Sequence, residues 1–110
     1  MLAQRRYERV AFFCPLQLTD LRNGTTVPAS SFDISIGGVG LTARMALVRG
    51  HPVRVRFRLR HESNGEIDED VLGKVAYCRS DEDGNCMGIQ FLEVIRESTQ
   101  PVLARRLNSL

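Results

Sequence analysis

The amino-acid sequence predicts an all-β fold: a six-stranded antiparallel β-barrel followed by one C-terminal α-helix. Dipeptides suited to the positive φ angles of tight hairpin turns occur as Asn23-Gly24, Asn64-Gly65 and Asp83-Gly84. Residues 53–60 alternate between an apolar side chain and arginine, which is the period-two pattern of a half-buried strand. Several short segments of this kind at hairpin spacing favour an antiparallel barrel or a closed sandwich.

Each expected strand has its own pattern. In the first, the apolar side chains that fall on one face are Val10, Phe12, Cys14, Leu16 and Leu18. The second is expected over Thr26–Ile34, with Phe32 and Ile34 on one apolar face, and Gly37-Gly38 ends it. The other four are expected at residues 39–43, 53–60, 71–79 and 87–91.

Helical patterns are confined to two segments. Residues 98–108 predict the C-terminal helix, because Ser98 or Thr99 can cap its start and Pro101 is tolerated in the first turn. Basic residues near its end suit the negative pole of the helix dipole. Met45–Arg49 is expected to add a single turn of helix between two strands.

Length and charge limit the class of protein. The chain of 110 residues predicts a single domain, with an arm at residues 1–9 and a barrel at residues 10–95. A net charge of +2 is mild for a protein that coats long nucleic acid, so we expect a small anionic partner and no DNA or RNA. With neither a leader-like segment nor a long apolar run, the chain is expected to be cytoplasmic and not inserted into a membrane.

Catalytic and metal motifs are not found in the sequence, so neither an enzyme nor a metal site is expected. Gly38–Ala43 matches a dinucleotide fingerprint, but the long helix and the downstream acidic residue of that motif do not follow. The three cysteines have no metal-ligand spacing and are expected to be reduced, half-buried thiols. The acidic run at residues 66–70 is expected in a solvated loop, with a Mg²⁺ or Ca²⁺ site as the alternative.

Arginine dominates the positive charge, and three arginines lie close together at the start of the chain. In an extended segment Arg5 and Arg9 point the same way, with Arg6 between them, so both can close on one ligand. Guanidinium groups fit phosphate oxygens and the O6/N7 edge of guanine. A solvated, partly disordered terminus is the alternative, although Tyr7 and the apolar run from Val10 tie the arm to the first strand.

A second polar cluster lies where the second expected strand ends. The Asp33 carboxylate can accept hydrogen bonds from the N1–H and 2-amino groups of guanine, and Ser35 can donate to a phosphate. Gly37 and Gly38 permit positive φ angles and close approach of the backbone to a ligand. Taken alone, the segment is equally typical of a β-turn with an Asx hydrogen bond.

Together the two clusters resemble the PilZ domain, the bacterial receptor module for cyclic di-GMP. Arg5-x-x-x-Arg9 followed by Asp33-x-Ser35-x-x-Gly38 carries the resemblance, and residues 73–79 and 87–91 extend it over nearly the whole chain. The resemblance implies a cyclic di-GMP receptor or adaptor whose arm moves onto the ligand and which then signals to an effector protein. The site it implies comprises Arg5, Arg6, Arg9, Asp33, Ser35, Gly37 and Gly38, to which Gln4, Tyr77 and Arg79 are possible additions.

Two other functions and some details stay open from the sequence. One is a PilZ-family subunit for protein interaction, as in pilus assembly, although such members are expected to lack the arginine arm. The other is a barrel for single-stranded nucleic acid, for which the supply of stacking aromatics is thin. Gln4 leaves open whether one or two nucleotides bind. The arginine face at residues 54, 56, 58 and 60 is either a solvated surface or a docking face.

Overall fold

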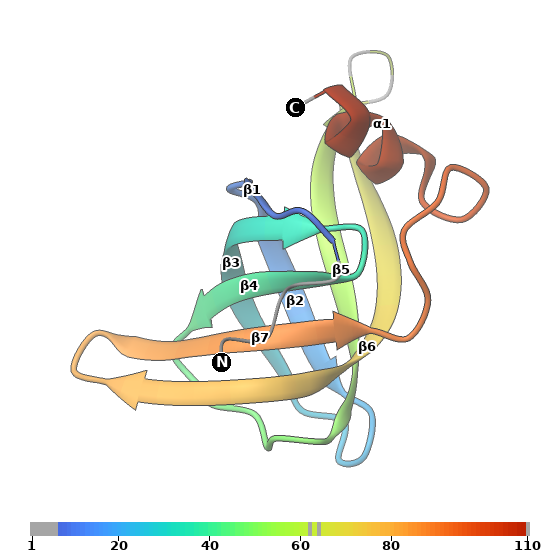
Figure 1. The fold of residues 1–110 in the computed structure, drawn as a ribbon. Coiled ribbons are helices and arrows are strands. Elements are labelled where there is room, and N and C mark those ends of the chain that lie inside the picture. Colours follow the sequence, from blue (N-terminus) through green and yellow to red (C-terminus); the bar gives the residue numbers. More distant parts are fainter. Residues whose placement is uncertain (1–6, 62, 64, 110) are drawn as a thin grey trace.

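The computed structural model describes residues 7–61, 63 and 65–109, which form seven strands and one helix (Figure 1). The elements are β1 (Val10–Ala11), β2 (Pro15–Asp20), β3 (Thr26–Ser35), β4 (Gly38–Ala43), β5 (Pro52–His61), β6 (Gly65–Asp81), β7 (Gly84–Phe91) and α1 (Pro101–Ser109). Every pair of neighbouring strands is antiparallel. The predicted class, antiparallel all-β with a C-terminal helix, is confirmed.

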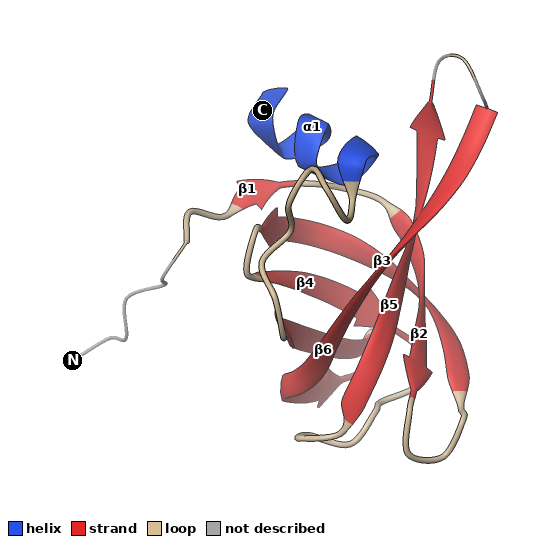
Figure 2. Ribbon diagram, turned by 90° about the vertical axis from the view of Figure 1, so that its right-hand side faces the viewer, coloured by secondary structure: helices blue, strands red, loops and turns tan. Residues whose placement is uncertain are grey.

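The strands close into a ring. Six of them are hydrogen-bonded in the order β3-β2-β5-β6-β7-β4, and β4 pairs back to β3. The short β1 pairs with the far end of β3, through Val10↔Ile34 and Ala11↔Asp33. Figure 2 shows α1 lying across one end of this ring, where Leu103 and Ala104 are buried in the core.

The inside of the ring is filled by the alternating apolar side chains. The predicted inward face of the first strand is confirmed from Phe12 onward, and the alternation at residues 53–59 also points inward. Phe57 is fully buried and meets Phe91 edge to face, with ring centroids 6.4 Å apart. The arginines of β5 therefore point outward.

The first predicted strand is interrupted in the structure. Residues 12–14 form a linker between β1 and β2 that keeps two backbone hydrogen bonds to β3, from the Phe12 amide to the Phe32 carbonyl and from the Ser31 amide to the Cys14 carbonyl. The Ser31 side chain adds two more. Its Oγ accepts from the Cys14 amide at 3.0 Å and donates to the Phe12 carbonyl at 2.6 Å. A side chain thus satisfies the Cys14 amide and the Phe12 carbonyl, which a continuous strand would have paired with backbone groups.

The expectation that Phe32 and Ile34 share one apolar face is wrong. A shift of register between Ser31 and Asp33, typical of a β-bulge, interrupts the pairing of β3 with β4. Ile34 stays fully buried, whereas the Phe32 ring lies on the outer side of the sheet over Gly40. The bulge therefore places both Phe32 and Asp33 on the outer surface.

The acidic run does not lie in a loop, because β6 begins earlier than predicted, at Gly65. Its carboxylates face the β5 arginines across the ladder: Asp70 accepts two hydrogen bonds from Arg56, at 2.8 and 2.9 Å. Arg58 lies 3.6 Å from Asp68 and 3.9 Å from Glu66. Opposite charges on facing residues stabilise this pairing, which makes the strand longer than its apolar alternation predicts.

The turns are close to prediction, apart from one segment. Gly24, Gly65 and Gly84 all have positive φ angles, of 77°, 70° and 129°, as the hairpin dipeptides predict. The expected helical turn at Met45–Arg49 is wrong, because this segment is a loop that buries Leu47 in the core. No helix within the described ranges has the length and apolar character needed to cross a lipid bilayer.

The helix begins at Pro101 and is capped differently from the prediction. Neither Ser98 nor Thr99 accepts a hydrogen bond from the amides of the first helical turn. Instead, buried Glu69 of β6 accepts from the amides of Val102 and Leu103, at 2.9 and 2.7 Å. A carboxylate at this end also suits the positive pole of the helix dipole.

Replacing Glu69 by alanine should therefore lower the free energy of unfolding by about 1–3 kcal/mol, since two amides lose their charged acceptor. The matched control is Glu66→Ala, which removes an exposed carboxylate from the same strand and should cost no more than about 1 kcal/mol. Chemical denaturation of both variants measures the difference. Equal losses would show that Glu69 does not anchor the helix.

Candidate functional site

The structure brings the two predicted polar clusters together through Arg9 and Asp33. Arg9 Nη1 donates to Asp33 Oδ1 at 2.8 Å, and both side chains are about four-fifths buried, with exposed fractions of 22% and 23%. The contact follows from the topology, because β1, which begins one residue after Arg9, pairs with β3 through Ala11↔Asp33. Gln4, Arg5 and Arg6 lie outside the described residues.

The bulge in β3 sets the direction of the Asp33 carboxylate. The same Oδ1 also accepts a hydrogen bond from the amide of Gly40 at 3.1 Å, so the backbone of strand β4 fixes the position of the carboxylate. A methyl group on Gly40 would lie 2.5 Å from this oxygen, so any other residue at that position would have to displace the Asp33 carboxylate. Asp33 is therefore oriented by a backbone donor and by an arginine at once.

Ser35, Gly37 and Gly38 form the tight turn that joins β3 to β4. Ser35 Oγ accepts from the Gly37 amide at 3.1 Å. The turn is thus closed by a serine side chain and not by the Asx hydrogen bond that the simpler interpretation of this segment expects, because the Asp33 carboxylate accepts from Arg9 and Gly40. The end of β7 and the chain that follows it hold the turn from outside. The amide of Phe91, the last residue of β7, donates to the Gly37 carbonyl at 2.9 Å, and the amide of Ile95 donates to the Ile36 carbonyl at 2.8 Å.

The glycines of the turn serve close packing rather than unusual backbone angles. Neither Gly37 nor Gly38 has a positive φ, so that expectation is wrong. The Tyr7 ring lies where a side chain on Gly37 would be, and the Ile89 carbonyl would be 2.6 Å from a methyl group on Gly38. Arg9 Nη2 would be 3.6 Å from the same methyl group, so the arm packs directly on this turn.

Two glycines that the sequence analysis did not assign to the site, Gly40 and Gly88, connect Asp33 with Tyr77 in a row across four strands. Gly40 of β4 is paired with Asp33 of β3 on one side and with Gly88 of β7 on the other, and Gly88 is paired with Tyr77 of β6. Both glycines face outward, and neighbouring side chains cover them: Phe32 and Asp33 over Gly40, and Tyr77 over Gly88. Glycine within a strand pattern often marks such a close approach, and this is the signal that could have revealed the row.

Tyr77 and Arg79 join the site from β6. The Arg79 guanidinium carbon lies 5.7 Å from the centre of the Tyr77 ring, which is cation–π geometry. Burial raises the pKa of the Tyr77 hydroxyl above its ordinary value of 10.0, and the nearby Arg9 charge opposes this in part. The phenol is therefore neutral at neutral pH, and the Arg9 charge is close enough to Tyr77 to influence its pKa.

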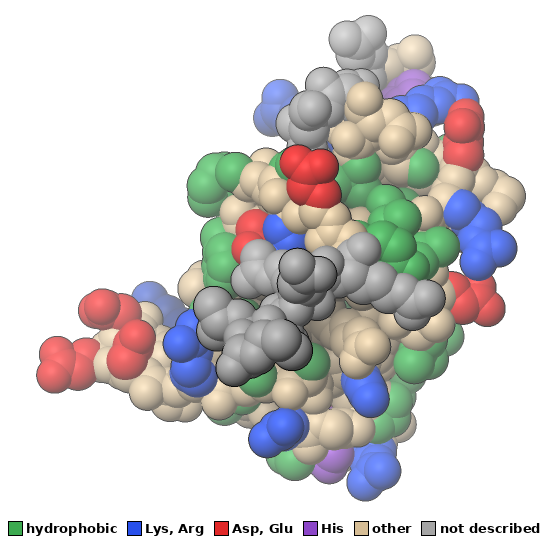
Figure 3. Space-filling model, in the orientation of Figure 1, with side chains coloured by type: hydrophobic (Ala, Val, Ile, Leu, Met, Phe, Trp, Pro, Cys, Tyr) green, Lys and Arg blue, Asp and Glu red, His purple; other side chains and the backbone are tan. Residues whose placement is uncertain are grey.

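The assembled surface combines two guanidinium groups, one fixed carboxylate and a flat aromatic ring. Such a set can bind an anion that also carries planar groups with hydrogen-bonding edges. Figure 3 shows that the acidic side chains of the β6–β7 hairpin, Asp81, Glu82 and Asp83, gather at its tip, away from the body of the molecule. Among the described residues, no group of three or more His, Cys, Asp or Glu side chains could hold a metal ion.

Fold and site together define a small antiparallel β-ring domain with a charged surface site where the N-terminal segment meets the β3–β4 turn. The chain belongs to the PilZ domain family, whose model matches residues 3–108. This family comprises receptors for cyclic di-GMP. The resemblance that the sequence suggested is confirmed.

Solved structures agree with this assignment at the level of the fold. MotI (DgrA), the inhibitor of motility from Bacillus subtilis, superposes with a TM-score of 0.70 at 17% identity over 98% of this chain. The chain spans about half of MotI, 53% of its length. The PilZ domain of Escherichia coli YcgR, solved with cyclic di-GMP, gives 0.61 at 19% identity, covering 96% of this chain and 87% of that one. The PilZ domain of CeSA from a cellulose-synthesizing bacterium gives 0.62 at 16% identity, covering 93% and 96%. No curated protein matches the chain.

Placing a methyl group on Gly88 should displace the Tyr77 ring, because the ring occupies the space that the methyl group needs. In a Tyr7→Phe background, where Tyr77 is the remaining tyrosine, Gly88→Ala should lower the pKa of Tyr77 toward 10.0 as the ring becomes solvated. Ultraviolet titration of tyrosinate measures the change against the same background with Gly88 intact. An unchanged pKa would mean that the ring does not depend on the glycine.

Proposed function

We propose that this chain is a cyclic di-GMP receptor that binds the nucleotide on the outer surface of the ring, between the N-terminal arm and the β3–β4 turn. The observation that carries the proposal is the Arg9–Asp33 contact at 2.8 Å. It joins the two motifs that define the family's ligand site, although 24 residues separate them in the sequence. The family match over residues 3–108 and the likeness to a PilZ domain solved with cyclic di-GMP support the same function.

Each side chain has a role that its chemistry allows. Arg9, together with Arg5 and Arg6 of the arm, binds phosphate oxygens or the O6/N7 edge of a guanine. The Asp33 carboxylate accepts from the N1–H and 2-amino groups of a guanine. Ser35 accepts from Gly37 within the turn and keeps its hydroxyl proton to donate to a phosphate.

The remaining site residues complete the surface. Gly37 and Gly38 let the nucleotide approach the turn backbone as closely as Tyr7 and Arg9 approach it here. Tyr77 offers a ring for stacking and Arg79 a second guanidinium group. Gln4 of the arm influences whether one or two nucleotides bind. The Arg9–Asp33 pair holds the last arginine of the arm in place before the ligand arrives, so less of the arm must be ordered on binding.

Signalling follows from the change in the arm. Ordering a residue costs about 1–2 kcal/mol of backbone freedom. Charge-assisted hydrogen bonds of roughly 1.5–3 kcal/mol each can offset this cost. The protein then acts as an adaptor without enzymatic activity: ligand binding reshapes the surface of a single PilZ domain in the cytoplasm, and an effector protein binds that surface.

Replacing either Arg9 or Asp33 by alanine should weaken cyclic di-GMP binding by about 100-fold or more, because each change removes charged hydrogen bonds to the ligand. Isothermal titration calorimetry measures the affinity, and thermal denaturation checks that the ring remains folded. Competition with GTP and with single-stranded DNA tests selectivity for the cyclic dinucleotide.

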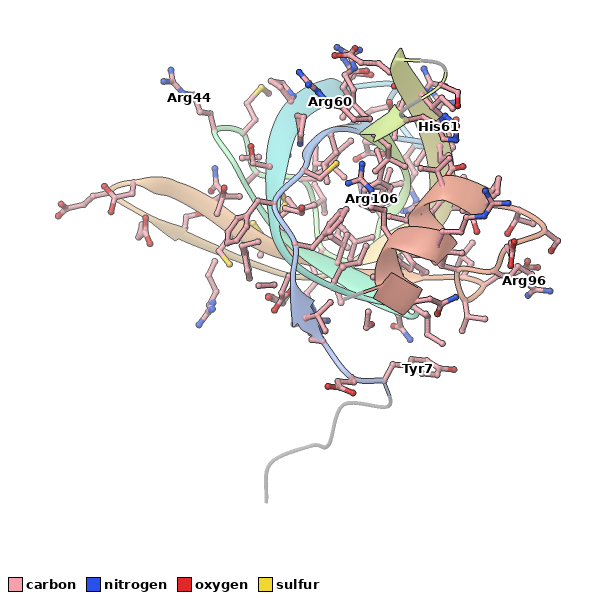
Figure 4. All side chains as sticks on the ribbon, turned by 90° about the horizontal axis from the view of Figure 1, so that it is seen from above. Tyr7, Arg44, Arg60, His61, Arg96 and Arg106 are labelled. Atoms are coloured by element: carbon pink, nitrogen blue, oxygen red, sulfur yellow. The ribbon has the colours of Figure 1, made fainter. Side chains whose placement is uncertain are left out.

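The matched control is Arg44→Ala, which removes an exposed arginine on the opposite side of the molecule from Tyr7 (Figure 4). Its affinity should stay within about twofold of the parent, since a distant surface charge contributes little. Unchanged binding by both site variants would refute the site. No binding by the parent protein would favour a family member that acts only through protein contacts.

A further inference from the structure

One edge of β5 extends beyond its neighbour. The pairing of β2 with β5 ends at Leu16↔Phe57, where β2 begins with a proline that has no amide proton to offer. On its other side β5 stays paired with β6 as far as His61↔Gly65. Within the described ranges, no strand lies against residues 58–61 on the β2 side, so this edge of β5 is open.

A groove follows the open edge. Its far wall is the linker at residues 12–14, which Ser31 holds against β3. The cavity between linker and edge has a volume of about 380 Å³, and Arg106 of α1 lies at its rim. A second cavity of about 510 Å³ adjoins it and shares Arg60, Glu66 and Arg106. Figure 4 looks down on this end of the molecule and shows Arg60, His61 and Arg106 grouped there.

Side chains occupy the backbone acceptors of this edge. Cys14 Sγ donates to the Arg58 carbonyl at 3.3 Å, and Arg106 Nη2 donates to the Arg60 carbonyl at 2.7 Å. Burial raises the pKa of the Cys14 thiol above its ordinary value, which keeps its proton available for this bond. Arg106 is exposed, so another donor can compete with it for this carbonyl. The edge is thus protected by side chains that an incoming strand can replace.

The walls of the groove differ from one face to the other. The inward side is apolar, formed by Leu59 and Phe12, whereas three arginines of the lining outnumber its one carboxylate, Glu66. These arginines are Arg58, which lies 3.9 Å from Glu66, together with Arg60 and Arg106. In the described part of the chain, neither Arg60 nor Arg106 has a carboxylate partner. Phe13 stands beside them with 81% of its surface exposed. Successive residues of a strand point to opposite faces, so a strand added here must alternate acidic and apolar residues.

The other edge of β5 already binds a strand of this kind. There Arg60, Leu59 and Arg58 face Glu66, Ile67 and Asp68 of β6, an acidic–apolar–acidic sequence. The open edge presents the same three β5 residues to its own side. A strand that binds the open edge is therefore expected to have the same acidic–apolar–acidic order as this part of β6.

We propose that the open edge of β5 at residues 58–61 is a docking site for an extended acidic–apolar segment of a partner protein, which adds as a strand beside Arg58 and Arg60. This surface would serve as the effector contact that the proposed receptor function requires. It rests on the proposed receptor function for its biological purpose only, since strand pairing alone leaves this edge open. The linker that forms its wall begins three residues after Arg9, so the wall of the groove and the arm are joined through the two residues of β1.

The probe is a synthetic peptide with the sequence of residues 65–72, Gly-Glu-Ile-Asp-Glu-Asp-Val-Leu, titrated into the ¹⁵N-labelled protein without nucleotide. Saturable shifts are expected in the amides of residues 12–15 and 58–61. Arg106→Glu and Phe13→Asp should each weaken binding by about fivefold or more. Arg44→Glu makes the same charge change elsewhere on the surface and should leave the affinity within about twofold.

In the peptide titration, the absence of a saturable shift, or shifts confined to other residues, would overturn the proposal. So would equal binding of a peptide with lysine at the acidic positions, or an equal loss of affinity in the Arg44→Glu control. Shifts at residues 58–61 that depend on protein concentration without peptide would identify a second copy of this chain as the occupant, which would also overturn it. Because no nucleotide is present, failure here is separate from failure of cyclic di-GMP binding.

Discussion

The ion pair between Arg9 and Asp33 is the contact on which the site depends, because it fixes the end of the N-terminal arm against the sheet. Three features of the chain produce it. Strand β1 pairs with the end of β3, the bulge after Ser31 turns Asp33 to the outer surface, and the Gly40 amide holds the carboxylate from below. Together these features bring the two polar clusters, 24 residues apart in the sequence, into contact.

The local chemistry of the sequence predicts much of the fold. Gly24, Gly65 and Gly84 adopt the positive φ angles that their dipeptides require, and the alternation at residues 53–60 gives the correct inward face. The errors concern contacts between distant segments. The acidic run is part of a strand because arginines on β5 pair with it, and the helix is capped by Glu69 of β6. Neither partner can be identified from the sequence near these residues.

The same distinction applies to the site. Residue types and order indicate Arg9, Asp33, Ser35 and the turn glycines, and the family resemblance joins them into one site. The bulge that turns Phe32 outward and the Gly40–Gly88 pair depend on strand register, which a single sequence does not reveal. The charge pattern of β5 has two consequences in turn: it binds β6 on one side and leaves a cationic edge on the other, close to the linker that follows the arm.

The central claim is that Arg9 and Asp33 act on one ligand as a coupled pair, and a double-mutant cycle tests it most directly. The affinity for cyclic di-GMP is measured by calorimetry for the parent, each alanine variant and the double variant. Residues that share a contact and a ligand should show a coupling energy of about 1 kcal/mol or more. Additive losses, within about 0.5 kcal/mol, would contradict the account, because they would mean that the two side chains act independently.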